Sequence, residues 1–323
     1  MVAGRSQRRI HRRHSAQSVA VSLASRLLVK NMVRAWAFQP DLAWPLASVD
    51  RFAGLVPHRP VVDIERLRLD HCVAEWVQAR GTSAQRAILY LHGGAFLTCG
   101  LNTHRSLVAR LSRAADACVL NVEYRMLPSH RISDAIDDGL SGLRWLIRQG
   151  YDPGQIVIAG DSAGGYLAFM TTLAALQAGL PKPAGIAAVS PFTDPDPTTK
   201  MGHRNADRCA MFPCGALPAF TRHLAQVTSP VDADLSSLPP VTIHASSDEL
   251  LLPDAEVMAE RLEAAGVPCD LHLWDGQIHD FPLAADVLPE GRRAIRYIGD
   301  FVKQVTEVTE PPKPGPRPGT AAA

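Results

Sequence analysis

The chain has 323 residues, of which 46% are apolar and 20% charged, so it can bury a large core. Its 33 basic and 32 acidic residues leave a net charge of +1, which excludes a global basic surface for nucleic acid. No apolar run reaches the roughly 18 to 20 residues that cross a membrane. The six cysteines form no C-x-x-C pattern, which favours free thiols in a reducing, cytoplasmic compartment, although Cys209 and Cys214 are close enough for a bridge.

The two ends of the chain differ from its middle. Residues 1–14 carry five arginines and no acidic residue, and we interpret them as a disordered basic tip. Residues 310–323 contain five prolines, which cannot continue a helix or a central strand, so we expect a disordered tail.

An apolar stripe follows the basic tip. Spacings of four residues predict an amphipathic helix at about 15–37, within a cap segment at 15–44. The residues of the stripe are Val19, Leu23 and Leu27, then Leu28, Met32 and Trp36. We expect this stripe to pack on the body of the protein, because apolar stripes usually face a core. The alternative is that the helix lies on an anionic membrane surface.

The middle of the chain alternates strand and helix patterns. Apolar runs predict strands at 87–92, 118–124, 155–159, 186–189, 241–245 and 269–274. Helical spacing predicts helices at 104–116, 135–149, 166–177 and 254–265. This alternation indicates an α/β domain at 45–309, with a mostly parallel sheet covered on both faces. Residues 195–238 break the rhythm with several prolines and no clear strand, so we expect an inserted cap above the strand ends.

A candidate nucleophile lies between a predicted strand and a predicted helix. The sequence Gly160-Asp-Ser162-Ala-Gly164 fits G-x-S-x-G in the strand–turn–helix context that this motif requires. The glycines leave room for the sharp turn that exposes the serine hydroxyl. Ser162 is therefore predicted to be a nucleophile, the alternative being a serine that only caps the helix.

Paired glycines after the 87–92 strand suggest an oxyanion loop. The run His92-Gly93-Gly94-Ala-Phe brings backbone N–H groups within reach of a substrate oxygen. We assign Gly93 and Gly94 as two donors and Ala163, which follows the nucleophile, as the third. His92 is expected to orient the loop rather than to transfer protons.

The base and its acidic partner should come late in the chain. His279 lies in a loop after the last predicted strand, as a general base of this design does. Asp248 follows the 241–245 strand and is the expected partner, with Glu249 and Asp254 as alternatives; Asp254 also fits a helix N-cap. The chain order Ser162, Asp248, His279 is that of the α/β-hydrolase design.

Four motifs in this order resemble the hormone-sensitive-lipase family of carboxylesterases, in its bacterial lipase/esterase branch. They are HGGAF at 92–96, GDSAGG at 160–165, SSDELLLPDA at 246–255 and GQIHDF at 276–281. VEYRMLPSH at 122–130 resembles the D-Y-R-L-A-P-E-H turn of that family. The sequence departs from the family at Ala95, where a third glycine is usual, and at Glu123 and Ser129, which replace Asp and Glu.

The resemblance covers about residues 85–303 and carries expectations about fold and cofactors. It implies an α/β-hydrolase core with a cap made of the N-terminal helices and the 195–238 insertion. It implies no metal and no cofactor.

The expected activity is hydrolysis of short- to medium-chain acyl esters. Ser162 attacks the ester carbonyl, His279 transfers the proton, and Asp248 holds the imidazole. A membrane-surface lipase or phospholipid-directed hydrolase is an alternative, with peripheral membrane contact through the N-terminus. A non-catalytic small-molecule receptor on this fold is another, but it would be expected to lack a triad member. The expected partner is a small acyl ester, with no nucleic acid; oligomeric state is left open, with a dimer among the alternatives.

Overall fold

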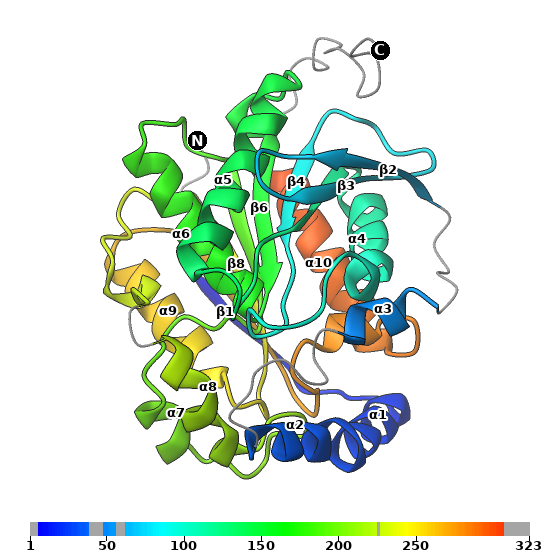
Figure 1. The fold of residues 1–323 in the computed structure, drawn as a ribbon, viewed down its shortest axis with the longest axis vertical. Helices are drawn as coiled ribbons and strands as arrows, with labels where there is room; N and C mark the ends of the chain where they lie inside the picture. The colour runs from blue at the N-terminus through cyan, green and yellow to red at the C-terminus, as the bar shows by residue number, and fades with distance from the viewer. Residues whose placement is uncertain (1–5, 39–47, 56–61, 225–226, 307–323) are drawn as a thin grey trace.

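The computed structural model describes residues 6–38, 48–55, 62–224 and 227–306, which surround one central sheet (Figure 1). The nine strands of this sheet lie in the order β1-β9-β8-β7-β6-β4-β5-β3-β2. They are β1 (Gln7–His11), β2 (Val62–Arg68), β3 (Val73–Ala79), β4 (Ala87–Leu91), β5 (Cys118–Glu123), β6 (Ile156–Asp161), β7 (Gly185–Val189), β8 (Val241–Ser246) and β9 (Cys269–Trp274). Only the β2–β3 and β3–β5 pairs of this sheet are antiparallel, which confirms the predicted α/β fold with a mostly parallel sheet.

Helices cover both faces of the sheet and make two apolar cores. On one face α5 (Ile132–Arg148), α6 (Ala163–Gln177) and α9 (Leu252–Ala264) share a core with the strands, and on the other α4 (Leu101–Ala115) packs beside α10 (Pro289–Val305) (Figure 1). Every residue of the central strands β4, β6, β7 and β8 is buried, which explains why their sequences are continuous apolar runs rather than alternating ones.

The basic tip contains a strand, contrary to the expectation of disorder over 1–14. Strand β1 pairs in parallel with β9 at the edge of the sheet. The His11 ring stacks on Trp274 with 3.8 Å between centroids, and Arg8 forms an ion pair with Glu256. The sequence of β1 is polar because the strand is at an edge and mostly exposed, so no apolar alternation marks it. The predicted tail at 310–323 lies outside the described residues.

The expected N-terminal helix is present as two helices. Helix α1 (Ala16–Leu27) and α2 (Val29–Ala37) meet at Leu28, and Ser15 caps α1 by accepting a hydrogen bond from the Ser18 amide. A short helix, α3 (Val49–Ala53), follows in the described part.

The insertion at 195–238 forms short helices and, where the structure describes it, no strand. Its helices are α7 (Thr198–Gly202), η3 (Cys214–Ala216), α8 (Leu217–Thr221), η4 (Arg222–Leu224) and η5 (Pro230–Asp232); η2 (Pro153–Gln155) and η6 (Phe281–Ala284) lie elsewhere in the chain. Figure 1 shows α7 and α8 beside α2 at one end of the molecule. Hydrogen bonds join the two parts, from Ser25 Oγ to the Ala210 carbonyl and from Lys30 Nζ to the Cys209 carbonyl.

Two further features bear on the class of protein. All six cysteines are free thiols, so Cys209 and Cys214 form no bridge. None of the helices that the structure describes is long and apolar enough to span a membrane.

Candidate active site

Ser162 lies on a sharp turn between β6 and α6. Its φ of 51° and ψ of −116° are strained for a residue with a side chain. A Cβ atom at Gly160 would lie 2.2 Å from the Gly164 carbonyl oxygen, and one at Gly164 would lie 1.9 Å from that of Leu91. The Ser162 amide donates to the Val189 carbonyl at 2.8 Å. The two glycines therefore permit the turn, as the motif predicts, and the serine is only 7% exposed.

The backbone of the oxyanion loop differs from the expectation at Gly93. The Gly93 amide donates to Asp161 Oδ1 at 3.0 Å. This N–H group is already hydrogen-bonded within the protein, contrary to the expectation that it is free to bind a substrate oxygen. The next two residues, Gly94 and Ala95, have φ values of 120° and 57°. The Ala163 amide is at the start of α6, where N–H groups have no acceptor within the helix. Gly94, Ala95 and Ala163 are therefore the candidate donors.

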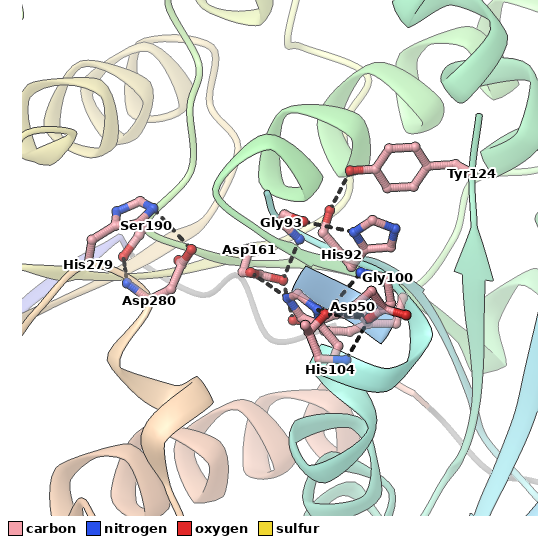
Figure 2. Close-up of polar contacts among 12 residues, drawn as sticks. Asp50, His92, Gly93, Gly100, His104, Tyr124, Asp161, Ser190, His279 and Asp280 are labelled. Atoms are coloured by element: carbon pink, nitrogen blue, oxygen red, sulfur yellow. Dashed lines mark hydrogen bonds and ion pairs between the residues drawn. The ribbon is translucent and has the colours of Figure 1, made fainter. Parts of the chain in front are cut away.

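A buried ion pair between Asp161 and His104 stabilises the oxyanion loop. Asp161 accepts a hydrogen bond from Tyr90 Oη at 2.6 Å, and its second oxygen lies 3.0 Å from His104 Nε2 (Figure 2). Burial raises the pKa of Asp161, but the charge and hydrogen bond of His104 outweigh burial and hold the pKa below its usual value. Burial lowers the pKa of His104, but Asp161 outweighs burial and the net direction is upward. An ionised Asp161 is thus held where it binds the Gly93 amide.

The support extends to helix α3. Asp50 accepts hydrogen bonds from the Thr103 amide at 2.8 Å and from Asn102 Nδ2 at 2.8 Å, which secures the first turn of α4 that carries His104. Figure 2 shows Asp50 on the side of His104 away from His279. Sequence reasoning did not identify Asp50, His104 or Asp161 as part of the site.

His92 is placed to orient the loop. Its ring stacks on Tyr124 with 4.2 Å between centroids, and Nδ1 lies 2.8 Å from the Gly93 carbonyl. The Tyr124 hydroxyl donates to the His92 carbonyl at 2.7 Å. Burial and the charge of His104 lower the pKa of His92 to about 4, so the imidazole is neutral near pH 7.

The carboxylate beside His279 belongs to Glu249, not to the expected Asp248. His279 Nδ1 contacts Glu249 Oε2 directly. The other oxygen of Glu249 accepts from the Ser246 amide at 2.7 Å and from Ser190 Oγ at 2.9 Å, so this side chain is fixed. Asp248 instead accepts a hydrogen bond from the Gly276 amide at 3.0 Å. The two acids are adjacent, and the turn after β8 points only the longer one at the histidine.

The other alternative, Asp254, forms an ion pair and hydrogen bonds that stabilise the fold and does not contact His279. It is buried on α9, 2.8 Å from Lys200 Nζ, and accepts hydrogen bonds from the Thr193 and Asp194 amides. Helix α9 begins at Leu252 after Leu251, so Asp254 lies in the first turn and is not its N-cap. It holds the start of the cap insertion against the helix.

A second carboxylate faces the other nitrogen of His279. Asp280 Oδ2 lies 3.0 Å from His279 Nε2, and the Asp280 amide donates to Ser190 Oγ at 3.2 Å (Figure 2). Burial raises the pKa of Asp280 to about 7, although His279 opposes this. Burial lowers the pKa of His279, but Asp280 and Glu249 outweigh burial and raise the pKa well above its usual value. An acid directly after the candidate base was the available sequence signal, and it was missed.

The serine and the histidine both follow the carboxyl ends of parallel strands, β6 and β9. The end of β7 connects them, because its last residue, Val189, accepts from the Ser162 amide, and the next residue, Ser190, bonds both Glu249 and Asp280. In the described residues His279 Nε2 makes no hydrogen bond to Ser162 and faces Asp280 instead. The cap insertion reaches these strand ends, with the Phe212 ring 4.9 Å from the His279 ring.

Known proteins resemble this chain over most of its length. A family model described as alpha/beta hydrolase fold matches residues 88–283. The chain is 38% identical over 297 residues to Esterase LipU of Mycobacterium tuberculosis, an alignment that covers 87% of this chain and all of LipU. It is 41% identical over 314 residues to Carboxylesterase/phospholipase LipF of the same organism, covering 90% of this chain and 83% of LipF.

A solved structure agrees with this assignment. The crystal structure of an esterase from the bacterial hormone-sensitive lipase family superposes with a TM-score of 0.80 at 31% identity, covering 91% of this chain and all of the other. Because the family match spans more than half of the chain and the relatives align almost from end to end, the chain belongs to the hormone-sensitive-lipase family of α/β-hydrolases and is a carboxylic ester hydrolase.

Proposed function

We propose that this protein is a serine carboxylesterase for short- to medium-chain acyl esters, with Ser162, His279 and Glu249 as its triad. The observation that carries the proposal is the contact between Glu249 and His279 at the carboxyl ends of the parallel strands, where the strained turn of Ser162 also lies. Glu249 takes the role that the sequence suggested for Asp248.

In the proposed mechanism Ser162 Oγ attacks the ester carbonyl while His279 Nε2 takes its proton. Glu249 keeps the proton of neutral His279 on Nδ1 and stabilises the imidazolium that forms. The N–H groups of Gly94, Ala95 and Ala163 bind the oxyanion. His279 then protonates the leaving alcohol, and water releases the acyl group by the reverse steps. Nε2 must turn from Asp280 toward Ser162 for the first step.

The cover over the site supports a preference for small acyl groups. Phe212 lies against His279. Trp36 forms an apolar cluster with Leu97, and Ala95 of the oxyanion loop and Phe220 of the insertion pack against this cluster. These aromatic side chains therefore lie beside the base and the oxyanion loop, and the nucleophile itself is almost fully buried. A short acyl chain needs less displacement of them than a long one.

A lipid-directed hydrolase is the second candidate. It is favoured by the relative LipF, which is named a carboxylesterase/phospholipase, and by exposed leucines on α1. A long acyl preference would support it over the short-chain proposal.

The test is Ser162→Ala, with Ser236→Ala on an exposed loop as the matched control. We expect Ser162→Ala to lower kcat for p-nitrophenyl butyrate by about a millionfold, since triad members act as a unit. A fluorophosphonate probe should label the wild type and Ser236→Ala but not Ser162→Ala. Labelling of Ser162→Ala, or activity well above background, would reject Ser162 as the nucleophile. A series of p-nitrophenyl esters from acetate to palmitate tests the acyl preference, and a maximum at palmitate would contradict it.

A further inference from the structure

Helix α1 presents its apolar residues to the outside and its small polar residues to the protein. Ser18 and Ser25 are buried, at 2% and 4% exposed, whereas Leu23 and Leu27 are 57% and 61% exposed. In a helix that only packs on a domain, the apolar stripe faces the core and the polar side faces water. The orientation of α1 is the reverse.

Polar bonds fix this orientation. Ser18 Oγ donates to the Gly276 carbonyl at 2.6 Å, and the bonds of Ser25 and Lys30 to the insertion hold the same side of the two helices. Among the apolar side chains of these helices, Val21 and Trp36 pack in apolar clusters of the protein. The expectation that the apolar stripe packs on the body holds for Trp36 but is wrong for its other members, Val19, Leu23, Leu27, Leu28 and Met32.

The outward side chains make one surface, which we call the apolar N-terminal face. It runs along α1 and α2 because its members recur every four residues from position 19 to 32, apart from one step of a single residue where the helices meet, and the last member follows six residues later. Its residues are Val19, Leu23, Leu27, Leu28, Met32 and Phe38. Leu28 at the end of α1 is 70% exposed, and Phe38 at the end of α2 is 89% exposed. Single exposed leucines are ordinary, but a row of this kind marks an interaction surface.

The charge around this face selects its partner. Residues 1–40 contain eight basic and no acidic residues, although the whole chain carries nearly equal numbers of each. Four arginines are exposed in the segment just before α1 or within α1 and α2, namely Arg12, Arg13, Arg26 and Arg34. A second copy of the chain would bring two such basic segments together and repel, whereas an anionic lipid surface attracts them.

We propose that the apolar N-terminal face docks on an anionic phospholipid surface. The helices would lie in the plane of the interface, with their leucines among the acyl chains and their arginines at the headgroups. The same helices reach the candidate active site, since Trp36 of α2 forms an apolar cluster with Leu97, and Ala95 of the oxyanion loop packs against this cluster. Figure 1 shows α2 beside the insertion helices α7 and α8. Docking would therefore place the entrance of the site next to lipid. This goes beyond ester hydrolysis and does not depend on the triad.

The experiment is vesicle sedimentation with the full chain. The probes are phosphatidylcholine vesicles and vesicles with phosphatidylcholine and phosphatidylglycerol in about equal parts. We expect binding to the anionic vesicles and weak binding to the neutral ones. Raising the salt from about 0.1 M to 1 M should weaken the binding, because it screens the arginines.

Two double variants separate the apolar and basic contributions. Leu23→Gln with Leu27→Gln should weaken vesicle binding on the order of tenfold for each leucine. Arg12→Gln with Arg13→Gln should remove much of the preference for anionic lipid. The matched control is Ile64→Gln with Val287→Gln, which changes two exposed apolar residues away from the face and should leave binding unchanged.

Vesicle sedimentation measures binding and does not depend on ester hydrolysis, so failure of this proposal can be told apart from failure of the proposed triad. Melting curves show that each variant is folded. Unaltered binding of the leucine variant, equal binding to neutral vesicles, or no binding to either would overturn the proposal. A dimer in analytical ultracentrifugation that the leucine variant abolishes would also overturn it, since a second copy would then cover the face.

Discussion

Neighbouring carboxylates around His279 have different environments, and this decides their expected roles. Glu249 touches Nδ1 and accepts two further hydrogen bonds, whereas Asp248 binds only a backbone amide at its carboxylate. The position of an acid after β8 could be predicted from the sequence. The choice between adjacent residues could not, because it depends on the direction of each side chain at the turn.

The acid assignment predicts unequal effects of two conservative substitutions. Glu249→Gln should lower kcat on the order of ten-thousandfold, since an amide neither holds the required tautomer nor stabilises the imidazolium. Asp248→Asn keeps an acceptor oxygen for the Gly276 amide, so it should lower the free energy of unfolding by no more than about 1 kcal/mol and leave kcat nearly unchanged. Steady-state kinetics and melting curves of both variants measure this. If the Asp248 variant were the one that lost activity, the acid would have to be reassigned.

Asp280 predicts how activity depends on pH. Catalysis requires neutral His279, and the two carboxylates raise its pKa, so kcat/KM should increase as pH rises through that raised pKa. Asp280→Asn removes one of the raising charges, so the acid limb of the profile should move to lower pH. Asp300→Asn, on the exposed part of α10, is the matched control and should leave the limb in place. An unshifted limb in the Asp280 variant would show that this carboxylate does not control the base.

At the scale of elements, burial on both faces made most of the sheet predictable. Strands β4 to β9 and helices α4, α5, α6 and α9 follow from apolar runs and helical spacing, within a few residues at their ends. Strands β1, β2 and β3 were not predicted. Strands β1 and β2 lie at the two edges and are mostly exposed, so their sequences lack a buried pattern. Strand β3 is mostly buried, but Glu75 and Gln78 interrupt its apolar residues. The amphipathic α10 was not predicted either, although it is one of the longest helices described.

The N-terminal helices show a different limit of the sequence. A spacing of four at Val19, Leu23 and Leu27 identifies one face of a helix, but spacing does not say whether that face turns inward. The answer lies in Ser18 and Ser25, whose partners at Gly276 and Ala210 are far away in the chain. Only tertiary contacts reveal which face is anchored.

At the scale of the whole molecule, N-terminal elements are joined to elements from late in the chain, β9 and α10. Strand β1 extends the sheet beyond β9, and Ser15 donates to Glu290 at the start of α10 through its amide at 2.7 Å. The strand and this bond fix the beginning of α1, whose inner side holds the loop before His279 through Ser18 and Gly276. The N-terminal strand therefore contributes to both the stability of the sheet edge and the position of the cap.

Deletion of residues 2–14 tests this connection. The deletion removes five cross-strand pairs, the His11–Trp274 stack and the Arg8–Glu256 ion pair. Cross-strand pairs contribute about 0.2 to 1 kcal/mol each, and 1 kcal/mol lowers Tm by about 2 to 4 °C in a domain of 150 to 250 residues. We therefore expect Tm to fall by several degrees in differential scanning calorimetry. Deletion of residues 2–5 leaves β1 intact and is the matched control. Equal Tm for the two deletions would mean that β1 adds nothing to the sheet and would restore the interpretation of a dispensable basic tip.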